Sequence, residues 1–159
     1  MKELNINVCV EELTLPELPA EQQELVGKAR EATSHSNAPY SNFNVGAAIR
    51  LGDGRIVIGA NQENAAFPLS LCAERTAIFA AQAQFPELPI TQIAITAKNA
   101  DGFLLEPVSP CGSCRQVMTE MEDRYNIDML VLLVGAEKIY RLKSAKDLLP
   151  LCFVDADMR

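Results

Sequence analysis

Residues Asp128 to Gly135 read DMLVLLVG, an almost continuous apolar run. A short run of this kind is typical of a strand buried on both faces of a sheet. Just before it, residues 112–125 predict a helix that carries these side chains on one face: Cys114, Val117, Met118 and Met121. Residues 90–97 form another β-rich run upstream of that helix. A strand, a helix and a second strand in this order predict an α/β domain.

Segments further towards the N-terminus continue the same pattern. Residues 45–50 and 55–61 are β-rich, and the LGDG turn between them predicts a hairpin, which would make the sheet mixed. Helical periodicity begins at Ala20, with apolar residues on one face: Leu25, Val26, Ala29 and Ala32. A second helical stretch, 71–84, is rich in alanine and is ended by prolines.

The C-terminal part adds a predicted strand at 138–142 and a short helix at 145–149. A chain of 159 residues suits one domain of the usual size. We therefore expect a single three-layer α/β/α domain over residues 20–159, with a mixed central sheet of about five strands. Residues 1–19 contain two prolines and show no clear period, so we expect an N-terminal arm there.

Composition excludes several classes of protein. The formal charge of −7 argues against a nucleic-acid binder, and 48% hydrophobic residues argue against disorder. No stretch approaches the roughly 20 apolar residues of a membrane span, and the first residues lack the apolar core of a signal peptide. We expect a cytoplasmic protein with neither a membrane nor a nucleic-acid partner. Its five cysteines are then metal ligands or free thiols rather than disulfides.

Two cysteine motifs carry candidate chemistry: Cys72-Ala-Glu-Arg75 and Pro110-Cys-Gly-Ser-Cys114. Residues three apart on a helix are neighbours, so Cys111 and Cys114 can present both sulfurs on one side of a first turn. With Cys72 they could surround a tetrahedral zinc ion. A redox pair remains an alternative, as does a structural zinc site completed by Cys9, Cys152 or His35. A carboxylate two residues from Cys72 favours a catalytic site, because Glu74 can move protons beside an open metal position.

The cysteine motifs and three further blocks resemble a known family. CAE followed by PCxxC is the zinc-deaminase signature with Cys in place of His, an arrangement already described for that class. PYSNFNVGAA (39–48), GANQENA (59–65) before CAERTA (72–77), SPCGSCRQ (109–116) and the weaker LLPLCF (148–153) resemble the small homotetrameric cytidine deaminases. Together these blocks span most of the chain from about residue 20.

The resemblance implies a fold, an activity and a cofactor. The fold would be that of cytidine deaminases. The activity would be hydrolytic deamination of cytidine and 2′-deoxycytidine to the uridines and ammonia, a pyrimidine-salvage reaction. It implies one zinc ion per subunit, bound by Cys72, Cys111 and Cys114, with Glu74 as proton shuttle. Arg75 would donate hydrogen bonds to ligand sulfurs and offset their negative charge.

It also implies how the nucleoside is bound. Asn61 and Glu63 would hydrogen-bond the ribose, chiefly its 3′-hydroxyl, and Phe43 would lie beside the ribose or base. The backbone of Ala73 and the carbonyl of Ser109 would read the base edge. A carboxylate near the sugar favours free nucleosides over nucleotides or polymers.

Two aromatic residues are implied to act between subunits of a homotetramer. Phe67 stands where the family often has Tyr, which reaches into a neighbouring subunit's site, so Phe67 lacks the hydroxyl. Phe153 resembles a C-terminal Phe that stacks over the base in an adjacent subunit. Two alternatives stay open: a deaminase of a modified cytosine nucleoside such as blasticidin S, and a non-catalytic zinc-stabilised binding module.

Overall fold

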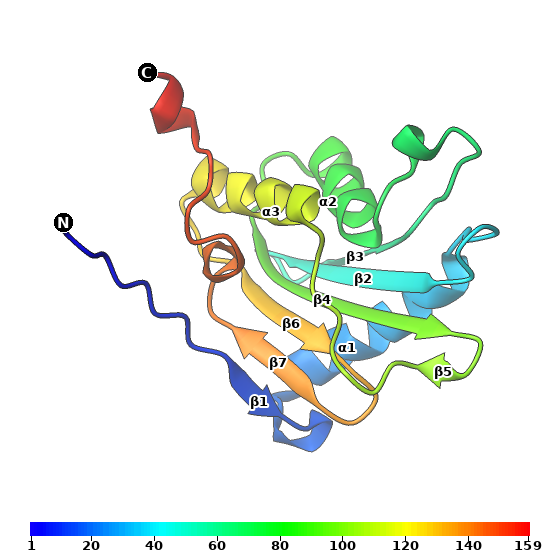
Figure 1. The fold of residues 1–159 in the computed structure, drawn as a ribbon. Coiled ribbons are helices and arrows are strands. Elements are labelled where there is room, and N and C mark those ends of the chain that lie inside the picture. The colour runs from blue at the N-terminus through cyan, green and yellow to red at the C-terminus, as the bar shows by residue number, and fades with distance from the viewer.

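A computed structural model describes residues 1–159 and contains one seven-stranded sheet with the order β1-β7-β6-β4-β2-β3, with β5 paired to β4 (Figure 1). The strands are β1 (Glu11–Leu13), β2 (Asn44–Leu51), β3 (Ile56–Ala60), β4 (Ile90–Asn99), β5 (Gly102–Phe103), β6 (Leu130–Val134) and β7 (Ile139–Leu142). Only β4 and β6 run parallel, because α3 makes the crossover between them. All other pairs are antiparallel, so the prediction of a mixed sheet is confirmed.

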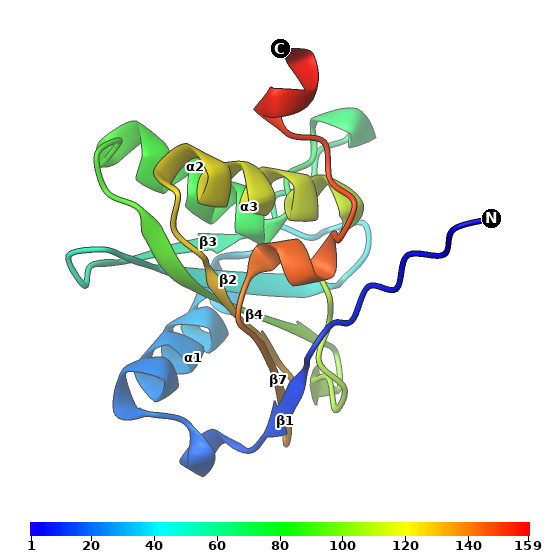
Figure 2. The same cartoon turned by 90° about the vertical axis from the view of Figure 1, so that its left-hand side faces the viewer.

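Three helices cover the two faces of this sheet (Figure 2). Helix α1 (Ala20–Ala32) lies on one face, and α2 (Ala73–Gln84) and α3 (Gly112–Tyr125) lie on the other. The predicted α/β/α arrangement is therefore confirmed. Short 3₁₀ helices connect or end these elements: η1 (Leu15–Glu17), η2 (Thr33–His35), η3 (Phe67–Leu69), η4 (Ala145–Leu148) and η5 (Asp155–Met158). None of the helices combines the length and the apolar character needed to cross a membrane.

The five strands expected from the sequence are all present, and the additional strands are short. Strand β1 has three residues and β5 has two, too few for a visible hydrophobic period. β5 pairs with the end of β4 directly before it, whereas β1 lies against the distant β7, where Glu11 forms an ion pair with Arg141 at 2.7 Å. β1 lies within residues 1–19, where the sequence predicted only an N-terminal arm.

Alternation along the strands divides the core into two layers. On β2, Ala47, Ile49 and Leu51 belong to the cluster beneath α2 and α3, whereas Ala48 belongs to the smaller cluster against α1. Successive strand residues point to opposite faces, so a central strand must be apolar on both. The same requirement explains why the central run at 128–135 is almost continuously apolar.

A glycine fixes the position of α2 above the sheet. A Cβ atom added at Gly59 of β3 would lie 2.4 Å from the backbone nitrogen of Ala77 and 2.5 Å from the carbonyl oxygen of Ala73. Both distances are shorter than van der Waals contact, so a larger residue would push the helix away. The close approach places the N-terminus of α2 directly over the end of β3.

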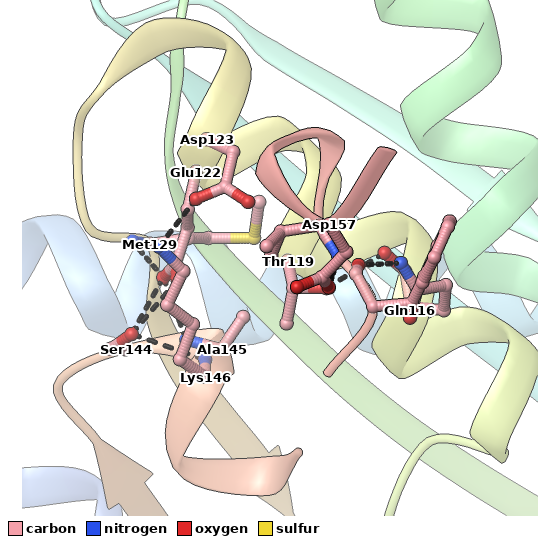
Figure 3. Close-up of polar contacts among 11 residues, drawn as sticks. Gln116, Thr119, Glu122, Asp123, Met129, Ser144, Ala145, Lys146 and Asp157 are labelled. Carbon is pink, nitrogen blue, oxygen red and sulfur yellow. Dashed lines mark hydrogen bonds and ion pairs between the residues drawn. The ribbon is translucent and has the colours of Figure 1, made fainter. Parts of the chain in front are cut away.

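A buried carboxylate fixes the opposite end of α3 (Figure 3). Glu122 is 3% exposed, and its Oε1 accepts hydrogen bonds from the backbone nitrogens of Met129 and Ala145, both at 2.7 Å. Both oxygens also accept from the hydroxyl of Ser144, at 3.0 and 2.9 Å. These contacts join the end of α3 to the start of β6 and to η4.

We expect replacement of Glu122 by alanine to destabilise the domain by about 3 kcal/mol, because it leaves two buried N–H groups without acceptors. For a chain of this length that corresponds to a fall of about 9 °C in melting temperature. Glu120→Ala is the matched control, since Glu120 is exposed on the same helix. Equal melting temperatures for the two variants would contradict the role given to Glu122.

Candidate metal centre and active site

Two helix N-termini bring three thiols together. Cys72 is the N-cap residue of α2, Cys111 is the N-cap residue of α3, and Cys114 lies in the first turn of α3. Their sulfur atoms lie within 4.8 Å of one another, with 3.7 Å between Cys72 and Cys111 and 3.5 Å between Cys111 and Cys114. Ligand sulfurs about 2.3 Å from a tetrahedral zinc ion are about 3.8 Å apart. The donor set therefore fits zinc without rearrangement of the backbone.

Contacts within the cluster favour a thiolate at Cys72. A hydrogen bond from Cys114 lowers the pKa of Cys72 to about 5, and Arg75 contributes by donating from Nη2 to the Cys72 sulfur at 3.7 Å. The same shared proton raises the pKa of Cys114, and burial raises it further. Helix N-termini add partial positive charge. Three thiolates and Zn²⁺ would carry a net charge of −1, which the Arg75 guanidinium balances.

Glu74 lies beside this cluster and lines the same pocket as Cys72 and Cys111. It is 3% exposed, in the first turn of α2. Burial raises the pKa of its carboxyl above the ordinary value, and the negative charge of Cys72 contributes to the rise. A carboxyl group with a raised pKa holds a proton more readily than an ordinary carboxyl group, which suits it to general acid and base catalysis.

The pocket has a volume of 480 Å³, within the range of small-molecule sites. It is lined by Ser41, Phe43, Val45, Asn61, Glu63, Ser70, Leu71, Cys72, Glu74, Ile95, Val108, Ser109 and Cys111. The structure thus brings Phe43, Asn61, Glu63 and Ser109, predicted as substrate-binding residues, to one pocket with Glu74. The expected residues come from four separate parts of the chain.

Hydrogen bonds hold the two polar residues that follow β3. Asn61 accepts from the hydroxyl of Ser36 at 2.6 Å and from the backbone nitrogen of Val45 at 2.8 Å, and it donates to the carbonyl of Phe43 at 2.8 Å. One N–H of its amide group has no protein acceptor among these contacts. Asn61 therefore fixes the loop that carries Phe43 and retains a donor for a ligand.

Glu63 is held by the loop before β2. Its carboxylate accepts from the backbone nitrogen of Tyr40 at 2.8 Å, from the backbone nitrogen of Ser41 at 3.3 Å, and from the hydroxyl of Ser41. The Ser41 hydroxyl bond is the largest cause that lowers the pKa of Glu63. Sequence reasoning gave no role to Ser36 or Ser41, although Ser41 belongs to the PYSNF block; their contacts depend on chain segments more than 20 residues away.

The other predicted site residues lie outside this pocket within the single chain. Ala73, the first residue of α2, is fully buried. Phe153 is 58% exposed and Phe67 is 67% exposed; Phe67 touches Tyr40 edge-on with ring centres 5.4 Å apart. Gln116 donates to the carbonyl of Phe153 at 2.7 Å, which holds the backbone there while the side chain stays exposed.

The geometry does not support a structural zinc site completed by a fourth protein ligand. The three-thiol group is the only cluster of three or more metal-binding side chains in the structure, so Cys9, Cys152 and His35 do not complete it. Arg115 donates from Nε to the carbonyl of Pro110 and from Nη1 to that of Leu148, both at 2.9 Å. These two hydrogen bonds hold the loop that carries Cys111 in place.

A mixed sheet, two helix N-termini with three convergent thiols and a buried glutamate define the class of zinc-binding deaminase domains. The family model described as the cytidine and deoxycytidylate deaminase zinc-binding region matches residues 19–128. The chain belongs to this family and is therefore a hydrolytic deaminase.

Individual relatives agree with that assignment. Cytidine deaminase of Halalkalibacterium halodurans is 38% identical over 138 residues, which cover 87% of this chain and 98% of the relative. The crystal structure of cytidine deaminase from Burkholderia pseudomallei superposes with a TM-score of 0.70 at 40% identity, covering 82% of this chain and 97% of that one. The cytidine deaminase from Mycobacterium tuberculosis gives a TM-score of 0.66 at 29% identity, covering 86% and 99%.

Proposed function

We propose that this chain catalyses the zinc-dependent hydrolytic deamination of cytidine and 2′-deoxycytidine to uridine and 2′-deoxyuridine, with release of ammonia, in pyrimidine salvage. The observation that carries the proposal is a buried Glu74 beside three convergent thiols in a nucleoside-sized pocket. The relatives named above as cytidine deaminases share most of the chain's length. A cytoplasmic location is part of the proposal, since reducing conditions would keep the thiols available.

Cys72, Cys111 and Cys114 would hold one zinc ion per subunit. When bound, zinc supplies a Lewis acid that activates a water molecule for attack on C4 of the base. Glu74 takes a proton from that water, delivers it to N3 of the pyrimidine and later passes a proton to the departing ammonia. Its burial keeps bulk water away from this transfer. The carbonyl of Ser109 and the backbone of Ala73 would orient the base edge.

Glu63 and Asn61 would bind the ribose at the outer end of the pocket. Hydrogen bonds lower the pKa of Glu63, which keeps it ionised at neutral pH as an acceptor for a sugar hydroxyl. An ionised carboxylate repels a nearby phosphate, so uncharged nucleosides are favoured over nucleotides. The spare N–H of Asn61 supplies a donor next to that acceptor.

We further propose that the active subunit is part of a homotetramer with shared sites. Support comes from Phe67 and Phe153, two large aromatic side chains that are more than half exposed in the single chain. Exposed aromatic rings of this kind are typical of surfaces that bind another chain or a base. Phe153 would stack over the base in an adjacent subunit, and Phe67 would contact a neighbour's site.

The test is incubation of the zinc-loaded protein with cytidine, 2′-deoxycytidine, cytidine 5′-monophosphate and blasticidin S. Loss of the cytosine absorbance band and release of ammonia are measured, with zinc assayed in the same sample. We expect turnover of the two nucleosides and at least tenfold slower turnover of the nucleotide. Deamination of blasticidin S alone would replace the proposed substrate, and no deamination by zinc-loaded protein would favour a binding module.

A further inference from the structure

The first ten residues have a strand pattern and no partner in their own chain. Large aliphatic side chains occupy every second position of the sequence LNINVCV, residues 4–10, with Asn5, Asn7 and Cys9 between them. Leu4, Ile6, Val8 and Val10 are 81%, 55%, 41% and 48% exposed. Alternation places these four side chains on one face of an extended segment. In Figures 1 and 2 this segment projects from β1, away from the body of the domain.

The segment continues an open sheet edge. β1 is an edge strand of the sheet and pairs only with β7, with Glu11 opposite Arg141. β7 ends at Leu142, and η4 begins three residues later, so the chain offers no ladder for residues before Val10. An unpaired edge with exposed N–H and C=O groups is a template for another strand.

The sequence of this segment is complementary to itself in the antiparallel sense. If two copies pair around a twofold axis through Asn7, Leu4 lies opposite Val10 and Ile6 opposite Val8. Lys2 then lies opposite Glu12, which places opposite charges together at each end. Glu3 faces Glu11, whose charge is already paired with Arg141 at 2.7 Å. A contact in which the same residues meet is the usual form of a twofold interface.

We propose that residues 2–12 form an antiparallel β-ribbon with the same residues of a second copy of this chain, joining two seven-stranded sheets across their β1 edges. The family model begins at residue 19, so this segment lies outside the region that defines the deaminase. The pairing satisfies the open edge of β1 and places the apolar side chains of the two copies against one another. It is independent of the proposed substrate and of the metal site.

Site-specific cross-linking tests the register. In a Cys9→Ser background, Asn7→Cys places two thiols across the twofold axis, whereas Glu3→Cys separates them by about 27 Å along the ribbon. Both positions are exposed and both variants retain the other native cysteines. With a short bismaleimide at low protein concentration, we expect at least tenfold more linked dimer from Asn7→Cys than from Glu3→Cys.

A further variant separates strand pairing from contact elsewhere. Ile6→Lys with Val8→Lys sets lysines against each other in the paired register, so the linked dimer from Asn7→Cys should fall at least tenfold. Deaminase activity should be unchanged, because these residues lie outside the pocket. Equal yields of linked dimer from Asn7→Cys and Glu3→Cys would overturn the proposal. No linked dimer from either variant would also overturn it, and would indicate that this segment binds a partner other than a second copy of this chain.

Discussion

The Glu74→Gln variant is expected to bind zinc as the parent does and to lose about 10³-fold in kcat, within the range for removal of a general acid and base. The amide keeps the size of the side chain but cannot accept a proton from water and deliver it to the base. Because Glu74 is only 3% exposed, a carboxylate from solution cannot take over its proton transfer. The measurement is steady-state deamination of cytidine, with zinc content determined on the same preparation.

Glu120→Gln serves as the control for this experiment, because Glu120 is exposed and lies outside the pocket. Its kcat should equal that of the parent protein. Near-normal turnover by zinc-loaded Glu74→Gln would exclude Glu74 as the proton shuttle. Loss of zinc from that variant would instead indicate that the carboxylate binds the metal.

The Cys114→Ser variant is expected to lose both zinc and activity. Cys114 is fully buried and is one of only three thiols in the cluster, so a serine leaves two sulfur ligands. Changes to residues that merely support a metal ligand weaken binding by about 10- to 100-fold, so removal of a ligand should exceed about 100-fold. Metal analysis after dialysis, together with the cytidine assay, measures both losses.

The matched control is Cys152→Ser, since Cys152 is a free thiol outside the cluster. This variant should retain zinc and the melting temperature of the parent. A bound metal stabilises the folded state by mass action, by about 2.7 kcal/mol at a hundredfold excess over Kd. Added zinc should therefore raise the melting temperature of Cys152→Ser and leave that of Cys114→Ser unchanged. Full zinc occupancy in Cys114→Ser would contradict the three-thiol site.

The main layers of the fold could be predicted from the sequence because long elements have visible periods. Helices α1, α2 and α3 and the five longer strands each carry enough residues to show their apolar faces. Strands β1 and β5 could not be found, because they have three and two residues and show no period; β1 also depends on pairing with β7, about 130 residues further along the chain. The buried role of Glu122 was missed for the same reason: its donors lie 7 and 23 residues away.

The candidate site divides in a similar way. Spacing and residue type were enough to single out Cys72, Cys111, Cys114 and Glu74, which the structure places together. The roles of Phe67 and Phe153 stay predictions, since both side chains are more than half exposed and neither lines the pocket of the single chain. The roles of Ser36 and Ser41 in holding Asn61 and Glu63 follow only from the contacts in the structure.

The sequence by itself determined the type of chemistry, because thiol and carboxylate groups have fixed reactivity and helix spacing fixes which neighbours they have. Tertiary structure alone decided that the two helix N-termini meet, with sulfurs 3.7 and 3.5 Å apart, and that Glu74 is buried and lines the same pocket. Gly59 permits the close packing of α2 on β3 that places one of these N-termini. A metal site needs atoms at the correct distances, and packing of distant segments sets those distances.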